Sequence, residues 1–119
     1  MKLLFQVLIL TFLTLTAHAK EVSFNGIKPA VIIDVRTQKE FSVGHIDGAI
    51  NIPFEQIGQE IHSIKGLKKD SPILVYCQSG RRSSIARQTL EQQGFTNILD
   101  GGGIDNLTKI LKVCTAQNC

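Results

Sequence analysis

The chain has 119 residues, of which 43% are hydrophobic and 19% charged, with 13 Lys and Arg against 10 Asp and Glu. This length allows one domain, and the mixed composition excludes collagen-like, coiled-coil and low-complexity classes. A net charge of +3 provides no basic face of the kind that nucleic-acid binding needs, so we expect no nucleic acid among the partners.

The first 19 residues have the pattern of an export signal. Lys2 precedes an uncharged apolar run at residues 3–15, and Ala-His-Ala at 17–19 matches a small-x-small cleavage site. We expect residues 1–19 to be removed, which would place the protein in the periplasm or outside the cell, without stable membrane insertion. The alternatives are an uncleaved anchor, although the run is shorter than the about 20 residues of a spanning helix, and a buried element of the domain.

The first predicted elements after this signal are a strand and a short helix. Residues 30–35 form a continuous, mostly β-branched run, which predicts a strand buried on both faces, as in a parallel sheet. Thr37 followed by Glu40 has the spacing of a capping box and predicts a helix to about Val43. Residues 44–53 are expected to form a turn and a short strand that ends at Pro53.

The rest of the chain continues this alternation. The expected elements are an amphipathic helix over about 54–64, a buried strand at 73–76, a helix over about 83–93, a strand at 96–99, a tight glycine turn at 101–103 and a helix over 104–113. Strands that alternate with helices on short loops predict an α/β domain with a mainly parallel sheet flanked by helices. We assign this domain to residues 20–113 and a C-terminal tail to 114–119.

A cysteine lies between the second buried strand and the helix that follows it. Cys77 is therefore at the position where open α/β sheets usually bind ligands. Gly80 lets the backbone turn sharply, so that loop amides and the helix N-terminus can converge on an anion. Such a field favours the thiolate, which is the nucleophilic form of cysteine. With Arg81 and Arg82 beside it, we predict that Cys77 is a reactive nucleophile and not an inert buried thiol.

Three ordered segments resemble the rhodanese-like family of sulfurtransferases. They are Asp34-Val35-Arg36 with Glu40-Phe41, residues 44–53, and residues 75–83. The three glycines at 101–103 fit the family's glycine turn, although Ile104 stands where an aromatic residue is frequent. The resemblance covers residues 31–111 and implies a single rhodanese-like domain.

The resemblance also implies a reaction. Cys77 would take the outer sulfur of thiosulfate, release sulfite and hold the sulfur as a persulfide, which cyanide or a thiol acceptor then removes. The substrate-binding residues implied in this way are those of the loop: Gln78, Ser79, Gly80, Arg81, Arg82 and Ser83. The two arginines would hold the sulfonate end of the donor, and the sequence leaves open which of them points inward. No bound cofactor is implied.

Other functions are compatible with parts of this pattern. Cysteine phosphatases and arsenate reductases need Arg at the sixth position after the cysteine, and Ser83 is found there, so the loop has the tighter, sulfur-sized form. A persulfide carrier or thiol-redox partner that passes sulfur to another protein is a second hypothesis, and a non-catalytic binding module is a third. The presence of Cys77 in the loop counts against the non-catalytic binding module, because a module without chemistry commonly lacks this cysteine.

Three further residues near the loop are expected to have structural roles. Asp34 and Arg36 follow the first strand, and we expect an internal ion pair or a capping interaction there. His45 belongs to the 44–53 segment and is expected to make a structural hydrogen bond. A metal site is not predicted, because the chain after residue 19 has two His and no Cys-x-x-Cys pair.

Two cysteines lie at the C-terminus. Cys114 and Cys119 are five positions apart, and in an oxidising compartment they are expected to form a small disulfide loop that leaves Cys77 free. The alternatives are two unpaired thiols in a frayed tail, or a tail cysteine that resolves or pairs with Cys77 as a redox switch.

Overall fold

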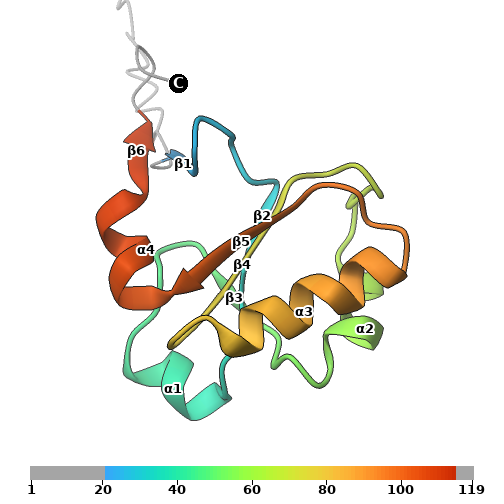
Figure 1. The fold of residues 1–119 in the computed structure, drawn as a ribbon, viewed down its shortest axis with the longest axis horizontal. Coiled ribbons are helices and arrows are strands. Elements are labelled where there is room, and N and C mark those ends of the chain that lie inside the picture. Colours follow the sequence, from blue (N-terminus) through green and yellow to red (C-terminus); the bar gives the residue numbers. More distant parts are fainter. Residues whose placement is uncertain (1–20, 115–119) are drawn as a thin grey trace, which may run out of the picture.

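The centre of the fold is a four-stranded parallel sheet with the strand order β3-β2-β4-β5 (Figure 1). The structure is a computed structural model and describes residues 21–114. The strands are β2 (Val31–Asp34), β3 (Ile50–Asn51), β4 (Ile73–Cys77) and β5 (Ile98–Gly103). All five residues of β4 are buried, as the continuous apolar run predicts for a central parallel strand.

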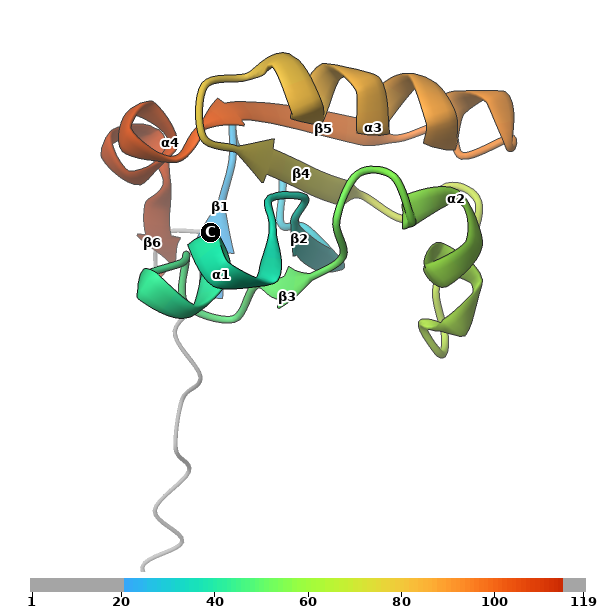
Figure 2. The same ribbon diagram turned by 90° about the horizontal axis from the view of Figure 1, so that it is seen from below.

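Helices cover both faces of the sheet, which confirms the predicted α/β class. One core joins the sheet to α2 (Ile57–Glu60), the 3₁₀ turn Ile61–Ser63 and α3 (Arg81–Gln92). The other core joins the opposite face to α4 (Ile104–Ile110) through Leu107. Seen from below, α3 and α4 lie at different places along β5 (Figure 2).

Helix α1 (Gln38–Val43) has no buried residue and is held by its cap and by polar contacts. The Thr37 hydroxyl accepts a hydrogen bond from the Glu40 amide at 3.2 Å, and the Thr37 amide donates to the Glu40 carboxylate at 3.2 Å. The capping box predicted from the Thr37–Glu40 spacing is therefore confirmed.

Three of the predicted helices need corrected boundaries, and the first two are shifted by a few residues at the start. The helix after the cysteine begins at Arg81 and not near Ser83, because Gly80 is its N-cap residue. The helix expected over 54–64 is shorter: α2 begins at Ile57, and the chain continues from Ile61 as a 3₁₀ turn. The apolar spacing correctly identifies the buried face, since Ile57 and Ile61 are both buried, but it does not report the tighter winding.

The glycines at 101–103 are not a tight turn but the end of β5. Gly103 pairs with Cys77, and the register shifts between Val75 and Cys77. Only Gly102 among the three has a positive φ, of 68°, so the irregularity is absorbed within the strand as a bulge.

The helix expected over 104–113 ends at Ile110, and residues Lys112–Cys114 form β6, which pairs antiparallel with β1 (Glu21–Ser23). This pairing joins the two ends of the described chain, and it carries the backbone of Cys114, the first residue of the predicted tail, into the fold. The export signal at 1–19 and Cys119 lie outside the described residues. Within residues 21–114, no helix is long and apolar enough to cross a bilayer.

Candidate active site around Cys77

Cys77 is the last residue of β4, and its side chain is seated inside the loop that leads into α3. The residue is 1% exposed, and its Sγ accepts a hydrogen bond from the Gly80 amide at 2.9 Å. Gly80 adopts a left-handed conformation with φ 103°, which is accessible to glycine and strained for other residues. This turn brings the first amides of α3 round to the sulfur, as the predicted anion-binding loop requires.

The surroundings of the sulfur favour its ionised form. Burial raises the pKa of Cys77, but the neighbouring Ser83 hydroxyl and the amides of Ser83, Gly80 and Ser79 lower it, and the pKa lies below its ordinary value. Ser83 is fully buried, and its hydroxyl donates a hydrogen bond to the Gly80 carbonyl oxygen at 3.0 Å. Amides that converge on one atom at a helix N-terminus stabilise negative charge, so the loop can hold a thiolate.

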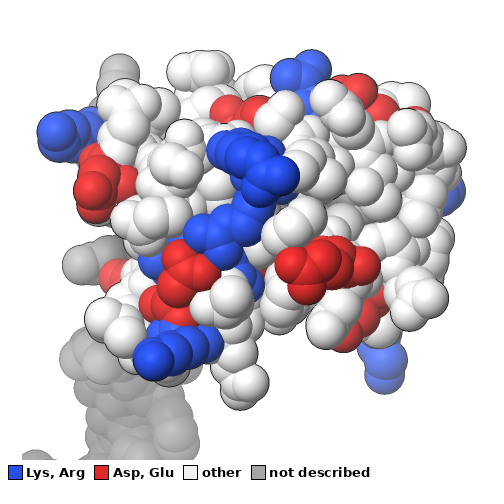
Figure 3. All heavy atoms as spheres, turned by 60° about the horizontal axis from the view of Figure 1, so that its bottom comes forward, with Lys and Arg blue, Asp and Glu red and all other residues white. Residues whose placement is uncertain are grey.

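The two arginines of the loop have different environments. The Arg82 guanidinium donates to both carboxylate oxygens of Glu40, at 2.7 and 2.9 Å, and so ties α3 to α1. Arg81 is exposed, and it makes no ion pair within the part of the chain that the structure describes. Of the two loop arginines, Arg82 is therefore neutralised by Glu40, and Arg81 keeps a positive charge that is available to a bound anion. Lys and Arg side chains run through the middle of this face, between acidic ones (Figure 3).

Asp34 and Arg36 form the expected ion pair beneath the loop. Asp34 is fully buried and Arg36 is 4% exposed, and Arg36 Nη2 lies 2.7 Å from Asp34 Oδ2. The same guanidinium donates to Gly44 O at 2.6 Å and to Gln78 Oε1 at 3.1 Å. It thus connects the strand end to α1 and to the residue that follows Cys77.

The glycine-rich end of β5 supports the loop from the opposite side. A Cβ at Gly103 would lie 2.7 Å from the Gln78 carbonyl oxygen and 3.3 Å from Ser79 Cα. The loop backbone can pack this closely on β5 only because residue 103 has no side chain. Gly103 therefore contacts the loop, a role that the prediction of a simple turn does not include.

His45 makes the hydrogen bond expected of it, with its Nδ1 2.8 Å from Phe41 O, and its ring stacks on that of Phe41 at 3.7 Å. The capping-box spacing predicts only a capping role for Glu40 and gives no sign of its contact with Arg82. An opposite charge in another helix is the only signal in the sequence, and it does not specify the pair. Cys119 lies outside the described residues, so the disulfide between Cys114 and Cys119 stays a prediction.

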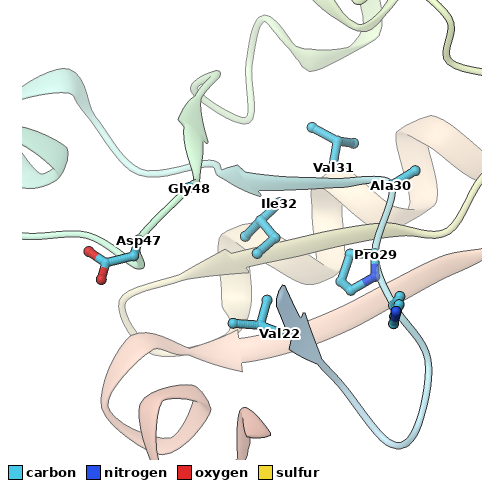
Figure 4. A pocket seen from close by; sticks show the side chains of 8 residues that line it. Val22, Pro29, Ala30, Val31, Ile32, Asp47 and Gly48 are labelled. Carbon is cyan, nitrogen blue, oxygen red and sulfur yellow. The ribbon is translucent and has the colours of Figure 1, made fainter. Parts of the chain in front are cut away.

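A pocket of about 250 Å³ lies elsewhere, at the start of β2, with Val22, Ala30 and Ile32 among its walls (Figure 4). It contains no residue of the cysteine loop. Parallel sheets usually bind their substrates at the carboxyl ends of the strands, which is where Cys77 lies. We therefore assign the candidate site to the Cys77 end of the sheet.

Comparison with known proteins agrees with this geometry. The model of the Rhodanese-like domain family matches residues 18–106. YqhL of Bacillus subtilis, an uncharacterized protein, is 46% identical over 79 residues, which are 65% of this chain and 60% of that protein. The thiosulfate sulfurtransferase PspE of Escherichia coli K12 is 35% identical over 75 residues, which are 63% of this chain and 71% of PspE.

A solved structure has the same fold. A rhodanese with anions from E. coli superposes with a TM-score of 0.62 and 30% identity, covering 71% of this chain and 98% of that one. The family resemblance predicted from the Asp34, Gly44–Pro53 and Cys77 segments is thereby confirmed. The chain belongs to the rhodanese-like family.

Proposed function

We propose that this protein is a sulfurtransferase that moves sulfane sulfur from thiosulfate to cyanide or a thiol through a persulfide on Cys77. The observation that carries the proposal is the position of the Cys77 sulfur, which is buried at the end of β4 and accepts a hydrogen bond from the Gly80 amide at 2.9 Å, where α3 begins. This arrangement suits a nucleophile that is anionic both before the reaction, as a thiolate, and after it, as a persulfide.

The first half of the reaction transfers sulfur to the protein. The Cys77 thiolate attacks the outer sulfur of thiosulfate, a bond forms between the two sulfurs, and the S–S bond of thiosulfate breaks. Sulfite leaves with the electron pair of that bond, and Cys77 carries the persulfide. Arg81 contacts the sulfonate end of the donor in this proposal, because Arg82 is already paired with Glu40.

The second half returns the enzyme to its starting state. The acceptor attacks the terminal sulfur of the persulfide, and the S–S bond to Cys77 breaks. The electron pair stays on Cys77 as the thiolate, so no external oxidant or reductant is needed. The two half-reactions form a ping-pong cycle.

Export is the second part of the proposal. It rests on the signal pattern at residues 1–19, and the first described strand begins at Glu21. Cleavage after Ala19 would leave every described element intact. The test is the N-terminal sequence of the protein recovered from the source cells. A start at Lys20 supports export, and a chain that retains residues 1–19 contradicts cleavage.

Intact-mass spectrometry before and after thiosulfate tests the chemistry. We expect a gain of about 32 Da, one sulfur atom, that is absent in Cys77→Ser and is removed by cyanide. No gain on reduced, folded protein would exclude thiosulfate as the donor. A gain that forms once but supports only slow turnover would instead favour a persulfide carrier.

The role of Ser83 has its own prediction. Ser83→Ala removes one of the groups that lower the pKa of Cys77, so the pKa should rise. The alkylation rate of Cys77 by iodoacetamide follows the thiolate fraction, and its pH profile should move to higher pH in the variant. Ser84→Ala, one residue further along α3, is the matched control. An unchanged profile in Ser83→Ala would contradict the assigned role.

A further inference from the structure

A pocket of about 260 Å³ borders the cysteine loop on its α1 side. It is lined by Arg36, Lys39, Glu40, Val43 and Gln78. Gln78 directly follows Cys77, so the pocket lies against the loop on which the persulfide would form. Its volume equals about nine water molecules, which is room for a small organic molecule.

The most unusual residue of this pocket is Val43. It is 86% exposed, and it belongs to a helix that buries no residue, so the core does not explain an aliphatic side chain here. Lys39 lies four positions earlier and therefore on the same face of α1, where its methylene stem can extend the apolar wall. A single exposed valine is ordinary on a protein surface, but this one lines a pocket that also includes Gln78, the residue that follows Cys77.

The charges around the pocket leave one cation unpaired. Arg36 is neutralised by Asp34, and Glu40 is neutralised by Arg82. Lys39 is exposed and has no carboxylate partner among residues 21–114. The pocket thus combines an aliphatic wall, a cation and a neighbouring sulfur nucleophile.

We propose that this pocket binds the sulfur acceptor, and that the acceptor is a small aliphatic thiol that carries a carboxylate. This inference rests on the proposed sulfurtransferase function and names the acceptor class for it. The acceptor's methylene groups contact Val43, and its carboxylate pairs with Lys39. Its thiolate attacks the terminal sulfur of the Cys77 persulfide, the S–S bond to Cys77 breaks, and the products are the acceptor persulfide and the Cys77 thiolate.

The kinetic test isolates the second half-reaction. Protein loaded with thiosulfate and freed of excess donor is mixed with 3-mercaptopropionate, 2-mercaptoethanol, cysteamine or cyanide, and loss of the 32 Da sulfur is followed by mass. For each acceptor, the rate of a variant is divided by the rate of the wild type, so that the intrinsic reactivity of the acceptor cancels.

We expect two distinct effects. Val43→Asn should slow 3-mercaptopropionate about fivefold, the loss expected for two methylene groups that are partly removed from water, and should change cyanide less than about twofold. Lys39→Glu should slow 3-mercaptopropionate about fivefold, the upper range for an exposed ion pair, and should accelerate cysteamine. Matched controls are Ile110→Asn, on the exposed surface of α4, and Lys65→Glu, which changes the net charge equally.

A binding measurement keeps this inference separate from the donor assignment. The thioether 3-(methylthio)propionate cannot attack a persulfide, and we expect it to shift the NMR signals of Val43 and Gln78 in the wild type and less in Lys39→Glu. If thiosulfate fails to load Cys77 but these shifts occur, the proposed function fails and the pocket assignment stands. If the shifts are absent at high concentration, or if all three thiols give the same variant-to-wild-type ratio, the inference is overturned.

Discussion

The cysteine loop lies between a packed wall, formed by α3 and β5, and a charged wall, formed by α1, and the two walls are held in different ways. On one side, α3 and β5 pack directly on it: Ala86 and Leu90 of α3 are fully buried, and Gly103 lets β5 approach the loop backbone. On the other side, α1 buries no residue and is joined to the site by the Arg82–Glu40 pair and by the bond from Arg36 to Gly44 O.

This difference separates where the sulfur lies from what surrounds it. Apolar packing depends little on pH and salt, so the position of Cys77 should be insensitive to both. Ion pairs are directional and respond to pH and to ionic strength. The charged wall can therefore vary in its contacts with substrates without displacing the nucleophile. Loss of a buried charge in this wall should lower the free energy of unfolding much more than loss of an exposed one.

The largest loss of stability is expected from the buried ion pair between Asp34 and Arg36, which connects the charged wall to the core. Asp34→Asn leaves the Arg36 guanidinium buried without its counter-charge, which should lower the free energy of unfolding by about 3–5 kcal/mol. Urea denaturation measures this loss. Glu91→Gln, which breaks the exposed pair between Arg87 and Glu91, is the matched control and should cost at most about 0.5 kcal/mol. Equal losses in the two variants would show that the Asp34–Arg36 pair does not anchor the α1 wall.

The next effect tests the packed wall. Gly103→Ala would place a Cβ 2.7 Å from the Gln78 carbonyl oxygen, and the resulting shift should cost about 1–3 kcal/mol and displace the loop amides from the sulfur. Persulfide formation should then fall even at temperatures where the protein remains folded. Gly44→Ala is the control, because a Cβ there meets nothing within 4 Å and its φ of 171° is extended. A fully active Gly103→Ala protein would contradict the close contact.

The sequence is most informative where the signal is local. The runs at β2 and β4 predict buried parallel strands because a strand that is covered on both faces is apolar along nearly its whole length. The capping box of α1 could be predicted, and is confirmed, because it involves only two residues that lie three positions apart. The cysteine, glycine and basic residues of the loop are contiguous, so their order along the chain is enough to locate the candidate site.

What the sequence does not predict depends on contacts between distant segments. β1 and β6 are three residues each, and neither has a pattern that predicts the other. The glycines of β5 resemble a turn in composition, but they continue the strand, in which Gly103 pairs with Cys77 and leaves room for the loop backbone. The pairing of Arg82 with Glu40 depends on how α1 sits against α3, which no local spacing reports.

The smallest effect, and the most specific to the charged wall, concerns Glu40. Hydrogen bonds from Arg82 are the main cause that lowers the pKa of Glu40 to about 2 from an ordinary 4.5. Glu40→Gln removes the ion pair, but Gln can still form the capping box with Thr37. Because both side chains are partly exposed, the loss in the free energy of unfolding at pH 7 should be only about 0.5–1 kcal/mol.

The pH dependence of that loss distinguishes the ion pair from other effects of the substitution. A carboxylate whose pKa is depressed in the folded state stabilises the protein above its unfolded pKa and loses this contribution as pH falls through its folded pKa. The difference between wild type and Glu40→Gln should therefore be constant well above pH 4.5, shrink as the pH falls through 4.5, and be lost only below the folded pKa of about 2. All other groups titrate in both proteins and cancel in the difference. A loss that does not change between pH 7 and pH 3 would mean that α1 is held by something other than this pair, and the contrast between a packed wall and a charged wall would have to be abandoned.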